Sequence, residues 1–179
     1  MIRRLFIALA LAAASFGAFA LTPAQLQTLK AAILAETTPA FVAFRAAGDK
    51  FSMAAWYNGA STTVVWKTSV SKAEIIQSPA FDWTRVDNLS VGKARIWDEM
   101  FSVGNINSAS ANIRAGIDAT WVGTQADLNV RAAVYAACKR FASRVEKLFV
   151  AGTGTDASPA VLTFEGNVSS SDIGEALEQ

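Results

Sequence analysis

Apolar residues recur every three or four positions along most of the chain, and this spacing predicts a succession of amphipathic helices. The first helix is expected to begin with Thr22 as its capping residue, because Pro23 follows directly and Gln25 stands three positions on. Similar start and stop signals predict further helices after Thr38, Asp49, Ser71, Ser108 and Ser169, and over residues 84–103 and 125–150.

Two segments depart from this helical spacing. Residues 61–68 are rich in threonine and valine and favour a short strand or an extended connector. Residues 161–166 alternate weakly and favour a strand or an extended arm. The pattern therefore predicts a mainly α fold: a single compact multi-helix domain with a small extended or β component and a C-terminal arm. The helical domain is expected to cover 21–151. Residues 152–179 form a loop, an extended segment and a terminal helix, which pack on that domain or reach from it.

The first 20 residues are typical of an export signal. Arg3 and Arg4 precede an apolar run over 5–16, and Ala18-Phe19-Ala20 has the small-x-small form that signal peptidase cleaves. This interpretation places the mature protein in the periplasm or outside the cell. An uncleaved membrane anchor and a true translation start near Leu21 remain as alternatives, and the second would leave the protein in the host cytoplasm or in a virion.

The charge balance disfavours a nucleic-acid partner. The chain has 16 basic and 15 acidic residues, and two of the basic residues lie in the leader, so the remainder is close to neutral. Domains that bind nucleic acid usually carry a clear positive excess. The composition also predicts no membrane contact beyond the leader.

The composition contains little that could perform catalysis. There is no histidine, which excludes histidine-based triads and makes most zinc sites unfavourable. The single cysteine, Cys138, lies on an apolar helical stripe and is expected to be a buried core residue rather than a reactive thiol. No nucleophile elbow, metal loop or paired carboxylates stand at catalytic spacing. We therefore expect no enzyme activity, no cofactor and no metal, and no small-molecule substrate is evident.

Basic residues on the predicted 125–150 helix form a first candidate interaction surface. Arg140, Arg144 and Lys147 stand at i, i+4 and i+7, a spacing that places them on one helix face. Such a stripe could bind an anionic partner. It could equally be a solvated face whose cations suit the negative end of the helix dipole.

Aromatic residues near the predicted strand form a second candidate surface. Trp56 and Tyr57 precede the Asn-Gly turn and Trp66 lies in the extended segment, where an aromatic side chain could anchor a protein interface or simply fill the core. Gly152 and Gly154 lie in the loop after the long helix, and they are a candidate hinge for the C-terminal arm.

Three phrases, over 65–75, 88–97 and 146–155, resemble a family of small, poorly characterised proteins encoded by tailed bacteriophages and prophages. The resemblance covers essentially residues 21–179. It implies a non-enzymatic role in the virion structural or assembly module, with the head–tail junction as a candidate location, and partners that are further copies or other virion components. It offers no catalytic residues. Members of the family begin near Leu21 and lack an export leader. The chain is therefore a phage-derived domain behind a signal, a sequence with a misassigned start, or a protein outside this family.

Overall fold

The computed structural model describes residues 21–179 and is mainly helical with a small β component, as the sequence predicted. The β component consists of two two-stranded sheets. The predicted leader lies outside the described residues. The α-helices are α1 (Pro23–Ala35), α2 (Pro39–Ala46), α3 (Lys50–Asn58), α4 (Lys72–Ile76), α5 (Val91–Met100), α6 (Ala111–Thr120), α7 (Gln125–Ala137), α8 (Arg144–Lys147) and α9 (Ser170–Glu178). The other elements are the 3-10 helix η1 (Trp83–Arg85) and the strands β1 (Ala60–Trp66), β2 (Lys139–Ser143), β3 (Val150–Ala151) and β4 (Val161–Leu162).

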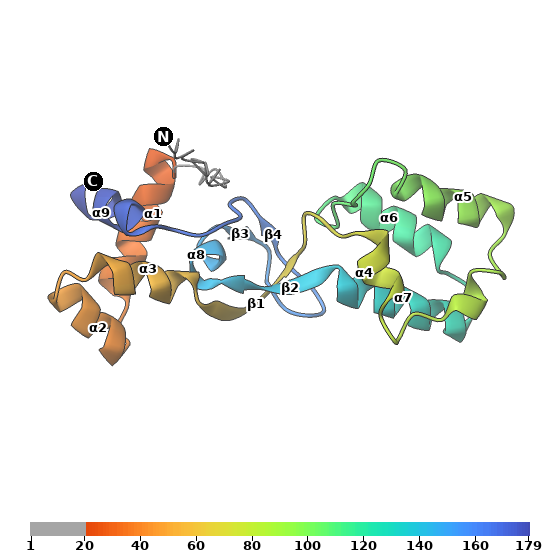
Figure 1. Ribbon diagram of the computed structural model, residues 1–179, viewed down its shortest axis with the longest axis horizontal. Helices are drawn as coiled ribbons and strands as arrows, with labels where there is room; N and C mark the ends of the chain where they lie inside the picture. The colour runs from red at the N-terminus through yellow and green to blue at the C-terminus, as the bar shows by residue number, and fades with distance from the viewer. Residues whose placement is uncertain (1–20) are drawn as a thin grey trace, which may run out of the picture.

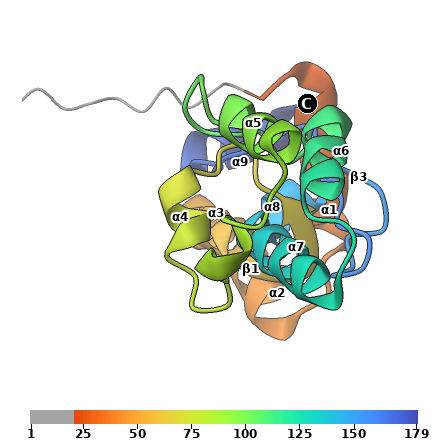
Figure 2. The same cartoon turned by 90° about the vertical axis from the view of Figure 1, so that its right-hand side faces the viewer.

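The helices gather at the two ends of an elongated molecule (Figure 1). We call the end formed by α1, α2, α3, α8 and α9 the terminal lobe, and the end formed by α4, η1, α5, α6 and α7 the middle lobe. Between them runs the antiparallel ribbon of β1 and β2. Viewed along the long axis from the middle lobe, α4, α5, α6 and α7 lie nearest the viewer (Figure 2).

The terminal lobe brings the two ends of the described chain together. Its helix α9 packs against α1 and α3, so the predicted C-terminal arm folds back onto the body. Asn58 at the end of α3 exchanges two hydrogen bonds with the backbone of Val168, at 2.8 and 2.9 Å. The buried apolar residues at this end are Leu21, Leu26, Leu29, Ile33, Phe41, Met53, Ala54, Tyr57, Val145, Phe149, Val168, Ile173 and Ala176.

Aromatic rings fill the centre of the middle lobe. The apolar helical spacing of the sequence predicts that Trp97 and Trp121 are core residues, and both are buried, with their rings nearly edge to face and centroids 5.3 Å apart. Phe81 contacts both rings. Cys138, also predicted to be buried, lies in the same cluster, and burial raises the pKa of its thiol to about 11. The thiol is therefore protonated at neutral pH and is a core group.

The ribbon continues into the C-terminal segment. Val64 donates a backbone hydrogen bond to Gly154, and Trp66 donates one to Ala160, so residues 154–160 lie along the free edge of β1. Beyond them β4 pairs with β3. A small apolar cluster of Val65, Ala142 and Ala160 fills this region, which makes the ribbon a packed connection between the lobes.

The helix predicted over 125–150 is wrong beyond residue 137. Its start is right, because Thr124 and Asp127 form the capping box, but the chain leaves the helix at Cys138 and continues as β2 and then as the short helix α8. Pairing with the β-branched residues of β1 overrides the helical periodicity. A local signal was present, because Ser143 and Glu146 form a second capping box that starts α8.

Two other helix boundaries also differ from the prediction. The segment 84–103 contains η1 and then α5, which starts only after Ser90, whose hydroxyl accepts from the backbone N–H of Lys93. Ser108 is not a helix cap. It is buried, and its hydroxyl lies 2.6 Å from the carbonyl of Lys67 and 3.0 Å from that of Cys138, while Ser110 precedes α6. Tertiary hydrogen bonding uses Ser108 in a way that no local pattern indicates.

Candidate binding pocket

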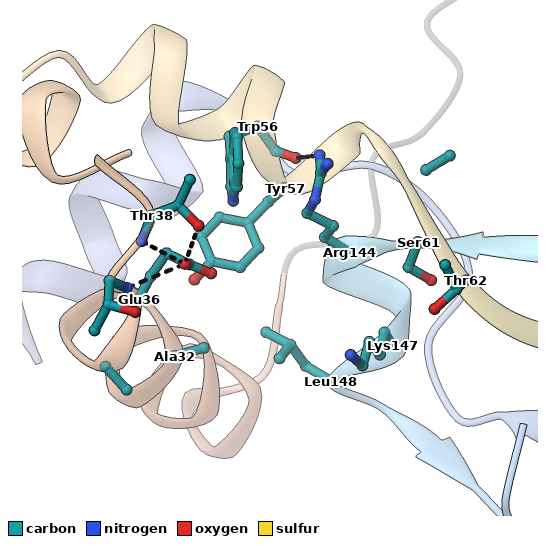
Figure 3. A pocket seen from close by; sticks show the side chains of 13 residues that line it. Ala32, Glu36, Thr38, Trp56, Tyr57, Ser61, Thr62, Arg144, Lys147 and Leu148 are labelled. Carbon is teal, nitrogen blue, oxygen red and sulfur yellow. Dashed lines mark hydrogen bonds between the residues drawn. The ribbon is translucent and has the colours of Figure 1, made fainter. Parts of the chain in front are cut away.

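A pocket of about 570 Å³ opens in the terminal lobe, between the end of α1, α3, the start of β1 and α8 (Figure 3). Its walls combine apolar, hydroxyl and charged side chains from segments that are far apart in the sequence. The lining residues are Ala32, Ala35, Glu36, Thr37, Thr38, Trp56, Tyr57, Ala60, Ser61, Thr62, Arg144, Lys147 and Leu148.

The turn after α1 fixes the acidic wall. Arg45 donates hydrogen bonds to the carbonyls of Ile33 and Leu34, at 2.6 and 2.9 Å, and so caps the end of the helix. Glu36 follows, and one of its carboxylate oxygens accepts from the hydroxyl and the backbone N–H of Thr38, at 2.6 and 2.9 Å. These hydrogen bonds, the hydroxyl first, lower the pKa of Glu36. The carboxylate is therefore held in place and negatively charged at neutral pH.

Trp56 and Arg144 form the opposite wall. The guanidinium of Arg144 lies 4.2 Å from the ring centroid of Trp56, a cation–π distance, and its Nη1 donates to the Trp56 carbonyl at 2.9 Å. A Cβ atom at Gly59 would collide with this guanidinium, so the turn after α3 needs glycine for the close approach. The indole Nε1 of Trp56 is buried and has no hydrogen-bond partner among the described residues.

Tyr57 lies between these walls, and Figure 3 shows its ring turned toward Glu36. The side chain is buried and packs edge to face on Phe41, with centroids 5.4 Å apart. Burial first, and then the charge of Glu36, raise the pKa of Tyr57 to about 12. The phenol is thus a neutral hydrogen-bonding group at neutral pH.

Lys147 lies at the end of α8 and is exposed. It forms no ion pair within the part of the chain that the structure describes. With Arg144 it gives the pocket two cations against the single carboxylate of Glu36. The pocket therefore combines a positive excess with hydroxyl groups, which suits an anionic or hydrogen-bond-accepting group.

The structure brings four of the six predicted interaction residues into this pocket: Trp56, Tyr57, Arg144 and Lys147. Trp66 is elsewhere, buried in the middle lobe with its ring 5.5 Å from that of Tyr135. The predicted helical stripe of three cations does not exist, because its first member lies on β2 and the other two on α8.

Arg140 belongs to a structural ion network instead. Its guanidinium binds both carboxylate oxygens of Glu146 at 2.7 and 2.8 Å, and it contacts Glu165 at 2.9 Å. Glu146 is only 5% exposed. Burial raises the pKa of Glu146, but the hydrogen bonds from Arg140 and from the backbone of Ser143 outweigh burial. The pKa of Glu146 is therefore lowered. This network ties β2 to α8 and to the C-terminal segment.

The candidate hinge glycines lie in the loop after β3, and both have positive φ, 115° at Gly152 and 68° at Gly154. Gly154 is buried against Thr63, where a Cβ would collide, and its carbonyl accepts from Val64. Close packing against β1 thus accounts for the glycine at position 154.

Glu36 and Thr38 were missed as pocket residues. Glu36 ends a helix with no motif around it, and the pattern marks Thr38 only as a cap. In the structure the Thr38 hydroxyl bonds Glu36 and makes no cap hydrogen bond to α2. Only the fold reveals that these two side chains line one pocket with Arg144.

No protein-family model, curated protein or solved structure matches this chain. Within residues 21–179 no helix has the length and apolar character needed to cross a membrane. No group of three or more aspartate, glutamate or cysteine residues in that range could hold a metal ion.

Proposed function

We propose that this protein is a non-enzymatic structural or assembly protein of a tailed phage or prophage virion, which acts through subunit–subunit contacts. The head–tail junction is its proposed place in the particle. The proposal joins the resemblance over residues 21–179 to one structural observation, namely that the pocket gathers four side chains suited to a protein interface. Aromatic and cationic groups in a concave surface are typical of the positions where interfaces concentrate their binding energy.

Exposed apolar side chains give further support. Phe51 on α3, Trp83 on η1 and Phe141 on β2 are more than half exposed, and they lie on the terminal lobe, the middle lobe and the ribbon. A virion subunit that contacts several neighbours needs contact residues on more than one side. The spread of these three side chains along the molecule fits that requirement.

The test is association. The purified chain, with its N-terminus determined by sequencing, is analysed by size-exclusion chromatography with light scattering, and then mixed with the proteins encoded by the neighbouring genes. We expect oligomers or complexes with head or tail proteins. A chain that stays monomeric and binds none of these proteins would contradict the proposal.

The second candidate is an exported protein that binds an unidentified partner in the periplasm or outside the cell. One observation favours it: the predicted cleavage site directly precedes Leu21, which is buried, and Thr22, whose capping box with Gln25 is formed. Cleavage after Ala20 would leave the terminal lobe complete. Sequencing the protein from the periplasmic fraction tests this, because the proposal requires an N-terminus at Leu21.

A further inference from the structure

Helix α9 carries only negative charges: Asp172, Glu175 and Glu178, with no basic residue. Glu175 and Glu178 are exposed, and their spacing of three positions places them on one side of the helix. Neither forms an ion pair in residues 21–179. Glu178 ends the helix, where the dipole is also negative; Lys30 contacts the carbonyl of Leu177 there but pairs with neither carboxylate, so a further cation beside them would be favourable.

The pocket offers the complementary groups. Lys147 is exposed and has no ion pair with any residue from 21 to 179, and Arg144 is held beside it by Trp56. Two cations beside hydroxyl groups favour a carboxylate as the bound group. Glu36 does not cancel this preference, because three donors already engage one of its oxygens and the two cations outnumber it.

The molecule's own α9 does not occupy the pocket. Lys30 on α1 contacts the carbonyl of Leu177, at 3.5 Å, which places the end of α9 beside Lys30. Ala32 lines the pocket two positions further along α1. Since successive helix residues are rotated by about 100°, these two positions point to nearly opposite sides of the helix. The acidic side of α9 can therefore meet a pocket only on another molecule.

We propose that the acidic side of α9, with Glu175 and Glu178, docks into the Trp56–Arg144–Lys147 pocket of a second copy of this chain. The two surfaces differ, so the contact is head-to-tail, and its repetition builds a ring where the rotation closes and a filament where it does not. This inference rests on the proposed function, and it identifies a second copy of the chain as the partner that binds the pocket.

A charge-exchange experiment tests the contact. Lys147→Glu makes the pocket repel α9, and the double variant E175K/E178K makes α9 repel the pocket. We expect each to raise the dissociation constant for self-association about tenfold or more, as for like charges placed together in an interface. Combining K147E with E175K/E178K restores opposite charges and should recover most of the association. Sedimentation equilibrium at low and high salt measures these constants, and the wild-type association should weaken with salt.

Matched controls separate a local effect from a change in overall charge. Arg95 and Glu99 are exposed on α5 in the middle lobe, far from the proposed contact. Arg95→Glu changes the net charge by as much as Lys147→Glu, and Glu99→Lys changes it by as much as each single substitution in E175K/E178K. They should leave the dissociation constant within about twofold. Trp56→Phe shrinks the ring on which the Arg144 guanidinium stacks, so that cation is held less firmly, and the variant should also weaken association. Circular dichroism verifies that every variant is folded.

The outcomes distinguish the two proposals. Recovery in the combined variant, with unchanged controls, supports the α9–pocket contact. Self-association that is insensitive to K147E and E175K/E178K overturns this contact and leaves the proposed function standing. A chain that is monomeric at all concentrations also overturns it, and if that chain further binds no head or tail protein, the proposed function fails as well.

Discussion

The two lobes are built in different ways. The middle lobe comes from one continuous stretch of chain, residues 66–138, and its centre holds the buried Trp66, Trp97 and Trp121. The terminal lobe is assembled from both ends of the described chain, and its centre is mainly aliphatic. The candidate pocket lies in the terminal lobe, where α3 and α8 are neighbours only because β1 and β2 pair. The candidate pocket thus forms where segments remote in sequence meet, whereas the middle lobe is built locally around its own core.

The largest expected effect tests whether the lobes are independent. Trp121→Ala removes a fully buried ring from the middle lobe and should lower the free energy of unfolding by about 3–5 kcal/mol. Hydrogen exchange should show lost protection in α5, α6 and α7 before α1 or α9. The matched variant Leu29→Ala, in the terminal lobe, should reverse that order. Equal loss of protection in both lobes from either variant would show that they unfold as one unit.

The ion network of Arg140, Glu146 and Glu165 should contribute to the stability of the whole molecule, because it holds the ribbon between the lobes. Arg140→Met removes the guanidinium and leaves the Glu146 carboxylate buried without its ion partner, which should lower the free energy of unfolding by about 3 kcal/mol. Chemical denaturation measures the change. The double variant R140M/E146L removes both charges and should recover part of the loss. No recovery would mean that the hydrogen bonds of Glu146 to the Ser143 and Gly166 backbone matter more than its charge.

Acid should weaken the middle lobe through Asp127. Hydrogen bonds from Thr124 first, and then from Arg85, lower the pKa of this carboxyl from 3.8 to about 2. A lowered folded-state pKa means that the stabilisation is fully present above pH 3.8 and disappears as the pH falls toward 2. Denaturant titrations across that range should show a smaller slope of stability against pH in Asp127→Asn than in the wild type. Identical slopes would contradict this assignment.

The smallest effect concerns the wall of the pocket. Arg144→Lys keeps the charge but loses the planar stack on Trp56 and should lower the free energy of unfolding by about 0.5–1 kcal/mol. Thermal unfolding measures it, and Arg131→Lys on α7 is the control, because its ion pair with Asp118 is long, at 3.5 Å, and the carboxylate is half exposed. A larger loss in the control than in Arg144→Lys would show that the stack contributes little.

Local signals in the sequence predicted the helix starts well. Thr22 with Gln25 forms the expected capping box, and Thr124 is the expected cap of α7, which Asp127 completes to a box, because a cap depends on residues only three positions apart. The apolar spacing also identified Trp97 and Trp121 as core residues. The helix through residue 150 was wrong because strand pairing between β1 and β2 depends on residues about 80 positions apart, which periodicity does not register.

For the candidate site too, local residue types were predictable and long-range placement was not. Residue type alone indicated that Trp56, Tyr57, Arg144 and Lys147 were suited to an interface, but the sequence supplied a wrong reason, a shared helix face, for grouping the two cations with Arg140. Arg140 instead forms an ion pair with Glu146, which holds the ribbon to α8.

The sequence by itself determined that the chain is mainly helical, where most of its helices begin, and which tryptophans form a core, because capping and apolar spacing act over a few residues. Only the tertiary structure decided that two lobes flank a β ribbon, that α9 folds back onto α1 and α3, and that Glu36 faces Arg144 across a pocket. Those arrangements depend on the packing of segments that are distant in the sequence, and a local sequence pattern does not show which of these segments meet in space.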